Sequence, residues 1–243
     1  MMIENLSKFI VTDNGFRIKL FENISFDILD NSITALIAPK GSGKSSLLKI
    51  LAGVDFQESA GKVENASFIP SEPSSFPWLN VKENIKFVKK ELSDEEIKNL
   101  CSVVGLEGYE SHFPNNKSIG FRFRISLARA LAVNPALIIV DEPFNYMDNA
   151  TRYEIYQLIL DINSKFGSTF LIGTANIAEA ILLSNKLHLL KEKPLVLFKS
   201  IDCDLTEKNV FDRFNSPKYS KCLAAVEKLI QSHQDKQLFT ISI

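Results

Sequence analysis

The stretch of the chain that decides its fold reads Ala38-Pro39-Lys40-Gly41-Ser42-Gly43-Lys44-Ser45-Ser46. It follows an apolar run, residues 33–37, that predicts a buried strand, and it precedes a helical pattern over residues 47–52 that Gly53 ends. A glycine-rich turn between a strand and a helix lets backbone N–H groups approach phosphate oxygens, because glycine tolerates the backbone angles that this approach needs. The sequence therefore predicts a phosphate-binding loop.

Each residue type in this loop has a role in phosphate binding. The helix N-terminus supplies N–H donors and partial positive charge, and Lys44 adds a full positive charge. The hydroxyl of Ser45 is a candidate ligand for Mg²⁺. A flexible loop with a chance lysine is the alternative, and the strand–loop–helix context favours binding of a nucleotide. The residues expected to contact it are Pro39, Lys40, Gly41, Ser42, Gly43, Lys44, Ser45 and Ser46.

A second group of candidate residues follows another apolar run. Residues 137–140 predict a central parallel strand buried on both faces, and Asp141 and Glu142 come directly after it. Open α/β sheets bind their ligands at the carboxyl ends of such strands. We expect Asp141 to share the Mg²⁺ shell with Ser45, and Glu142 to be the catalytic residue that orients or deprotonates an attacking water. An ordinary exit from a strand into a loop would also account for the two carboxylates.

The composition sets outer limits on the function. With 243 residues, 45% of them hydrophobic, the chain can bury a large core, and a net charge of −1 gives no general reason to bind nucleic acid. The three cysteines have no metal-ligand spacing, so we expect reduced thiols used in packing. We see neither a signal peptide nor an apolar stretch approaching the ~18 residues of a membrane span, so we expect no direct membrane insertion.

The order of the expected elements predicts an α/β fold. Strands over residues 2–10, 17–20 and 24–28 favour an antiparallel subdomain at the N-terminus, in which Phe9 or Phe16 could stack on adenine, although core packing explains either equally well. Helical patterns over 81–104 and 122–133, with a capping box at Ser93–Glu96, indicate an inserted helical lobe. We therefore divide the single domain of residues 1–243 into a nucleotide-binding core (1–70 and 135–200), a helical lobe (71–134) and a helical tail (201–243).

Taken together, these segments resemble an ATP-binding cassette (ABC) ATPase over nearly the whole chain. The resemblance includes residues 104–114 and 122–131, which flank the family's signature motif, the Walker B strand at 137–143, and the helix at 177–180. Glu72-Pro73 with Pro77-Trp78-Leu79 is similar to the loop of nitrate, sulfonate and taurine importer ATPases. The resemblance implies a P-loop core with an N-terminal antiparallel β subdomain and an inserted helical lobe.

Several positions depart from the family pattern. The signature falls on residues 117–121, where Ser118 and Gly120 remain but Ile119 replaces a glycine. The glutamine of the Q-loop falls on Ser71, and the switch histidine falls on Ala175. In the family, the signature contacts ATP held by the other subunit, so Ser118 and Gly120 are expected to contact a partner's nucleotide. A β-branched Ile119 crowds that approach, and Ala175 cannot hydrogen-bond phosphate.

These observations yield one main hypothesis. The resemblance implies an ATP-binding subunit, paired with a second ABC ATPase subunit as a homo- or heterodimer, that drives a separate permease. ATP and Mg²⁺ are its expected cofactors, and an importer acting at the inner face of the cell membrane, with slow hydrolysis, is the expected role. The alternative is a non-hydrolysing cassette in which ATP is a structural or regulatory ligand. A cassette acting on nucleic acid is less favoured, because such proteins usually join two cassettes or carry long insertions.

Overall fold

The computed structural model describes residues 1–11, 14–55, 61–115, 117–191, 194–203 and 205–232. Two sheets carry its strands. A six-stranded sheet has the order β4-β5-β6-β3-β7-β8, in which only β8 is antiparallel to its neighbour, and β1 and β2 form an antiparallel pair. The strands are β1 (Met2–Val11), β2 (Arg17–Asp27), β3 (Ile33–Ile37), β4 (Ala66–Ile69), β5 (Leu137–Asp141), β6 (Phe170–Thr174), β7 (Lys186–Lys191) and β8 (Val196–Asp202).

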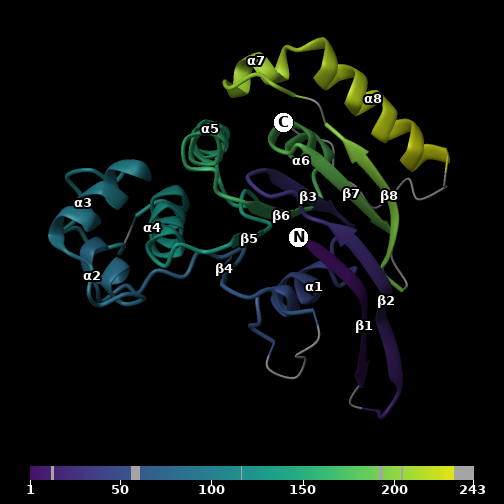
Figure 1. The fold of residues 1–243 in the computed structure, drawn as a ribbon, viewed down its shortest axis with the longest axis horizontal. Coiled ribbons are helices and arrows are strands. Elements are labelled where there is room, and N and C mark those ends of the chain that lie inside the picture. The colour runs from purple at the N-terminus through teal and green to yellow at the C-terminus, as the bar shows by residue number, and fades with distance from the viewer. Residues whose placement is uncertain (12–13, 56–60, 116, 192–193, 204, 233–243) are drawn as a thin grey trace.

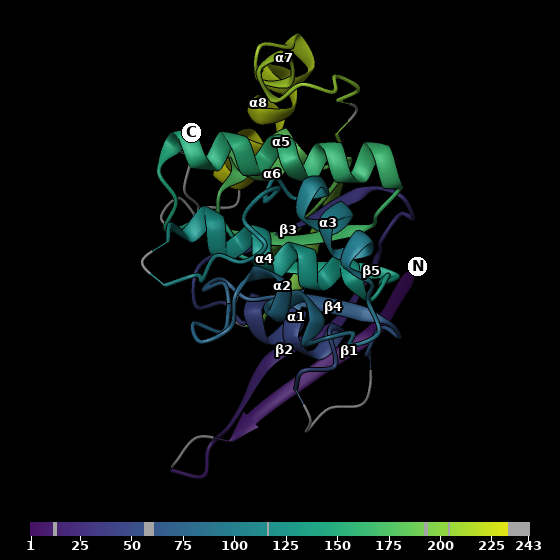
Figure 2. The ribbon, with the colours of Figure 1, turned by 90° about the vertical axis from the view of Figure 1, so that its left-hand side faces the viewer.

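Helices cover both faces of the larger sheet (Figure 1). Helix α1 lies on the face that also carries β1 and β2, and α5 and α6 lie on the opposite face, with α7 and α8 beyond them. Helices α2, α3 and α4 form a separate group at one side, which Figure 2 views from the front. The helices are α1 (Lys44–Leu51), α2 (Val81–Lys86), α3 (Asp94–Val103), α4 (Ile119–Ala132), α5 (Asn149–Phe166), α6 (Ile177–Leu183), α7 (Val210–Phe214) and α8 (Pro217–Ser232).

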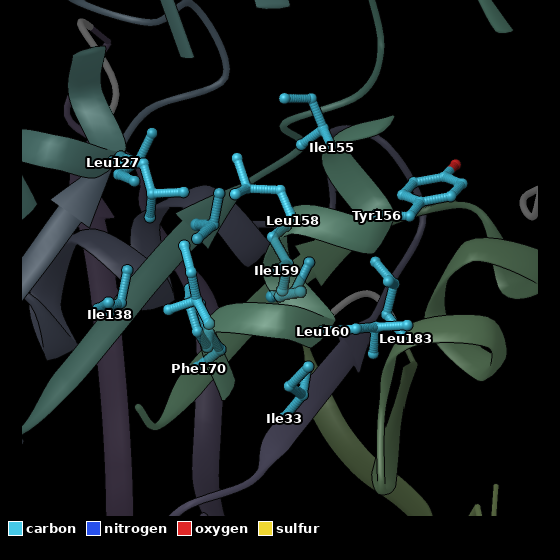
Figure 3. Packing of buried hydrophobic residues seen from close by; sticks show 14 of the residues in the cluster. Ile33, Leu127, Ile138, Ile155, Tyr156, Leu158, Ile159, Leu160, Phe170 and Leu183 are labelled. Atoms are coloured by element: carbon cyan, nitrogen blue, oxygen red, sulfur yellow. The ribbon is translucent and has the colours of Figure 1, made fainter. Parts of the chain in front are cut away.

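The all-apolar central strands divide their side chains between two cores. In β5, Ile138 and Val140 join the core under α5 and α6, whereas Leu137 and Ile139 join the core under α1 and β2. Successive side chains of a strand point to opposite faces, so a strand covered on both faces has no exposed position for a polar residue. Figure 3 shows Ile138, Ile33 and Phe170 facing the α5 residues of the first core. This packing fixes the carboxyl ends of β3 and β5, where the candidate residues lie.

The structure corrects one expectation about the antiparallel subdomain and adds detail to the tail. The two strands expected over residues 17–20 and 24–28 form one strand, β2. The strand continues between them because Asn23 adopts a left-handed conformation, with φ 48°, where the pairing register with β1 shifts. The expected tail begins while β8 still continues to Asp202, and it includes a short helix, α7, that the sequence did not indicate. The bounds of core, lobe and tail stay a prediction.

The helical lobe follows its capping signals. Ser93 and Glu96 form the expected capping box at α3, and Asn80 and Glu83 form a second one at α2. Each box satisfies backbone N–H groups that a helix start leaves without partners. Within the described part of the chain, no helix is long and apolar enough to cross a bilayer.

Candidate nucleotide-binding site

A pocket of about 420 Å³ lies at the start of α1. Two glycines shape its floor: Gly41 and Gly43 have φ values of 76° and 101°, which side-chain-bearing residues rarely adopt. A Cβ at Gly43 would also lie 2.9 Å from Cγ of Leu20, so a side chain there would displace Leu20 as well as strain the backbone. Seven of the eight loop residues expected to bind nucleotide line the pocket: Pro39, Lys40, Gly41, Gly43, Lys44, Ser45 and Ser46.

The remaining loop residues have other roles. Ser42 does not line the pocket, and its hydroxyl is buried without a hydrogen-bond partner in the described part of the chain. Ala38, which replaces the first glycine of the motif, is fully buried and is not among the residues with positive φ. Alanine is therefore compatible with the backbone at this position, and the departure from the motif does not distort the loop.

Lys44 and Glu142 form an ion pair across the pocket. Lys44 begins α1 and Glu142 directly follows β5, and their side chains are 4% and 10% exposed. Glu142 is held by its N–H, which donates to the carbonyl of Gly173 at 2.8 Å. Its φ of 44° places a non-glycine residue in the left-handed region, a conformation that costs about 1–3 kcal/mol and is frequent at functional sites.

A glycine also gives Lys44 its position. A Cβ at Gly173 would lie 2.4 Å from Cδ1 of Leu48 and 3.3 Å from Cδ of Lys44. The bare backbone of β6 therefore lets α1 approach the sheet closely enough for Lys44 to reach Glu142. The sequence predicts separate roles for Lys44 and Glu142, and the structure brings the two side chains into contact.

Asp141 has the environment of a cation ligand. Burial raises the pKa of its carboxyl group, and the Ser45 hydroxyl and the charge of Lys44 act in the opposite direction. Its Oδ1 atom is buried and has no hydrogen-bond partner among the residues that the structure describes. A buried, unpaired carboxylate oxygen beside a serine hydroxyl fits Mg²⁺, which prefers oxygen ligands and keeps several waters and phosphate oxygens. Among the described residues no cluster of three His, Cys, Asp or Glu could hold a metal, so protein side chains would supply only part of such a shell.

The expected signature residues lie outside this pocket. Ser118 is the N-cap of α4, and its Oγ accepts a hydrogen bond from the N–H of Phe121 at 3.2 Å. Gly120 packs against α5, since a Cβ there would lie 2.4 Å from Cγ2 of Thr151. Neither residue lines the pocket of its own chain. Their expected contact with the nucleotide of a partner subunit stays a prediction from the family resemblance.

Ala175 and Ser71, which stand at the positions of the switch histidine and the Q-loop glutamine, do not supply the missing side-chain groups to the pocket. Ala175 is buried and offers no polar side-chain atom. The side chain of Asn176 accepts the N–H groups of Ala178 and Glu179 and so caps α6. Ser71 is partly exposed and does not line the pocket.

Neither aromatic residue proposed for adenine lines the pocket. Phe9 lies on the β1–β2 pair with the guanidinium carbon of Arg17 4.1 Å from its ring centre, and Phe16 is exposed near the other end of the turn. Their roles stay predictions. The residues that the sequence reasoning missed are Leu20 of β2 and the neighbours Asn145 and Tyr146, which all line the pocket. Asn145 and Tyr146 follow Glu142 by three and four residues, and this closeness in sequence could have indicated that they line the same pocket.

Comparisons with known proteins agree with this fold. The model of the ABC transporter family matches residues 21–145. The aliphatic sulfonates import ATP-binding protein SsuB of Bacillus anthracis is 33% identical over 84% of this chain and 86% of its own length. SsuB of Bacillus subtilis is 37% identical, with 74% and 76% covered.

Solved structures show the same fold. The dimeric bacterial ABC transporter cassette MJ0796 aligns with a TM-score of 0.70 at 24% identity, over 84% of this chain and 99% of that one. CbiO1 of Clostridium perfringens, part of the ABC transporter complex cbiONQ, aligns with a TM-score of 0.70 at 21% identity, over 93% and 98%. These comparisons support the main hypothesis and give no support to the alternative in which ATP is only a structural or regulatory ligand. With its phosphate-binding loop, its Asp141–Glu142 pair and its inserted helices in the family's order, the chain belongs to the ABC transporter family and has the fold of that family's ATPase cassettes.

Proposed function

We propose that the chain is the nucleotide-binding subunit of an ABC importer, in which ATP binding and slow hydrolysis drive a separate permease. The observation that carries this proposal is the pocket in which Lys44 of the phosphate-binding loop faces Glu142 beside the unpaired oxygen of Asp141. Relatives that cover most of the chain are import ATP-binding proteins, which supports the importer role. Aliphatic sulfonates are the substrates named for those relatives, and a related organic anion is the transported substrate that we propose.

The residues of the pocket divide the work on ATP. Backbone N–H groups at the start of α1 and the Lys44 ammonium bind phosphate oxygens, which requires Lys44 to leave Glu142. Ser45 and Asp141 would hold Mg²⁺, which supplies positive charge to neutralise the phosphate groups. Glu142, once released from Lys44, can accept a hydrogen bond from the attacking water and orient it. Nucleotide binding thus also frees the proposed catalytic carboxylate.

We infer that an aliphatic surface holds the base of the nucleotide. Leu20 lines the pocket, and Ile18 lies on the same face of β2 because side chains two residues apart share a face. Ile10 is the cross-strand partner of Ile18, and both are exposed. Ile10 and Ile18 would thus continue the apolar surface of Leu20 beyond the pocket, whereas Phe9 is paired with Lys19 and so lies on the opposite face of the strand pair. Ile18→Asp should therefore weaken ATP binding more than Phe9→Ala, and the reverse order would favour Phe9.

A second cassette is part of this proposal. Ser118 is exposed at the N-terminus of α4, and a helix N-terminus offers N–H groups and partial positive charge to phosphate. Since Ser118 does not line its own pocket, the nucleotide that it contacts belongs to a partner subunit. Dimeric structures of the related cassette MJ0796 support this arrangement.

The permease is proposed to dock on three aromatic residues of the helical lobe. Trp78 and Phe87 are 70% and 60% exposed, and their rings lie 5.6 and 4.5 Å from the ring of Phe76 between them. Asn84 holds the loop in place, because its Oδ1 accepts the N–H of Phe76 at 2.8 Å and its Nδ2 donates to the carbonyl of Leu79 at 2.8 Å. A rigid, exposed aromatic group of this kind is typical of interface anchors. Docking there would place the chain peripherally at the inner face of the membrane.

Sedimentation of the full chain tests the proposed function. With Mg-ATP, we expect wild type to shift from monomer toward dimer, because each nucleotide joins one subunit's loop to the other subunit's α4. Lys44→Ala should remove the shift, and Lys98→Ala, an exposed lysine on α3, should leave it unchanged. A chain that stays monomeric at saturating Mg-ATP, or a dimer that forms equally without nucleotide, would contradict the proposal for a chain that assembles alone.

A further inference from the structure

Two cysteines that the nucleotide site does not use lie in contact on the far side of the molecule. Cys203 directly follows β8 and Cys222 belongs to α8, and their Sγ atoms are 3.1 Å apart as free thiols. Cys203 is 2% exposed, whereas Cys222 is half-buried and accessible from solvent. The third cysteine, Cys101, is fully buried in the helical lobe. The chain thus holds one adjacent pair of thiols and one isolated thiol.

The pair joins two parts of the fold. Cys203 is fixed to the sheet, because its N–H donates to the carbonyl of Asn185 at 2.7 Å. Helix α8 packs against α6, whose N-cap, Asn176, directly follows the buried Ala175. A covalent bond between the two sulfurs would therefore tie α8 to the end of the sheet.

We propose that Cys203 and Cys222 are a redox-sensitive pair that forms a reversible disulfide with a low-molecular-weight disulfide as oxidant. Cys222 is the entry point, since it is the accessible thiol. The two thiols share a hydrogen bond in which either sulfur can be the donor, and this contact lowers the pKa of Cys222 and raises that of Cys203. The Cys222 thiolate attacks one sulfur of the oxidant, breaks its S–S bond and releases a first thiolate.

The second exchange completes the bond. Cys203 loses its proton and attacks Sγ of Cys222, which breaks the mixed disulfide and releases the second thiolate. The two protons of the cysteines end on the two released thiolates, so the two protein thiols are oxidised and one small disulfide is reduced to two thiols. The burial of Cys203 favours this internal step, because the contact distance keeps it close to Cys222 and away from other oxidants.

Thiol trapping in a glutathione buffer tests the proposal on the full chain. With excess oxidised glutathione, we expect only one of the three thiols, Cys101, to react with an alkylating agent after acid quenching and denaturation, and peptide mapping should find Cys203 joined to Cys222. Reductant should restore all three thiols. Cys101→Ser should leave the bond intact, and Cys203→Ser should leave glutathione attached to Cys222.

Three outcomes would overturn the proposal. The first is that glutathione stays attached to Cys222 in wild type, and the second is that a disulfide forms between two chains. The third is that all three thiols of wild type stay unmodified in the oxidising buffer. Hydrogen exchange provides the second readout: exchange of α8 amides should slow in the oxidised chain, and should be unchanged by oxidant in Cys203→Ser. Equal exchange in oxidised and reduced wild type would show that the bond does not restrain α8.

Discussion

Replacing Glu142 with glutamine should move stability and ATP affinity in opposite directions. In the nucleotide-free chain, Glu142 compensates the charge of Lys44, whose side chain is only 4% exposed. Removing one partner of a buried ion pair costs about 3–5 kcal/mol, and we expect about 3 kcal/mol because the pair borders an open pocket. Glutamine keeps the shape of the side chain, so the loss reports the charge.

The same change should tighten ATP binding. Lys44 would no longer have to leave a carboxylate before it binds phosphate, and a hydrogen bond to a charged group contributes about 1.5–3 kcal/mol. Since each 1.4 kcal/mol is tenfold in affinity, we expect ATP to bind about 10- to 100-fold more tightly. Turnover should fall, because Glu142 no longer accepts a proton from water.

Urea unfolding without nucleotide and calorimetric titration with Mg-ATP measure the two effects. Glu154→Gln is the matched control, because Glu154 is 67% exposed in its pair with Arg124 and such surface pairs contribute about 0–1 kcal/mol. We expect the control to change neither stability nor ATP affinity by much more than that. A Glu142→Gln chain that is as stable as wild type and binds ATP with equal or lower affinity would refute the competition between Glu142 and phosphate for Lys44.

Three further predictions address docking, turnover and pH. Trp78→Ala should weaken co-purification with the permease by about 2 kcal/mol or more without changing ATP affinity, and unchanged co-purification would exclude Trp78 as an anchor. Restoring Ile119→Gly, Ser71→Gln and Ala175→His together should raise phosphate release by about 10²-fold or more, whereas a fast wild type inactivated by Glu142→Gln would show that these positions cause no defect. Burial lowers the pKa of His188, so the unfolded chain binds more protons below pH 6.5 and the free energy of unfolding falls as pH drops through that range. His188→Gln should flatten this part of the plot of unfolding free energy against pH, and parallel plots for wild type and variant would contradict the prediction.

The parts of the site that follow from the sequence are those in which chemistry restricts the residue type. Gly41 and Gly43 are required by a left-handed backbone, and Lys44 by phosphate charge, so a short motif was enough to predict them. The run before Asp141 was readable because a strand buried on both faces is apolar throughout. The fold class and the family resemblance are confirmed by the sheet order and the comparisons.

The parts that the sequence did not reveal depend on contacts between distant segments. Leu20 lines the pocket because β2 passes over Gly43, and no local pattern announces that crossing. Strand β2 continues through Asn23, which is in the left-handed conformation, although the alternation of apolar and polar residues is interrupted there. Helix α7 has five residues, too few to show a helical period. The contact between Cys203 and Cys222 likewise arises from tertiary packing, since their spacing matches no known motif.

Calorimetric titration of wild type and Lys44→Ala with Mg-ATP tests the central claim most directly. Lys44, which pairs with Glu142, carries a full positive charge into the pocket, and we expect its removal to cost about 1.5–3 kcal/mol of binding free energy, a loss of about tenfold or more in affinity. Lys98→Ala, in the helical lobe, should bind as wild type does. Equal ATP affinity in wild type and Lys44→Ala, or no binding by wild type at all, would contradict the assignment of this pocket as the nucleotide site.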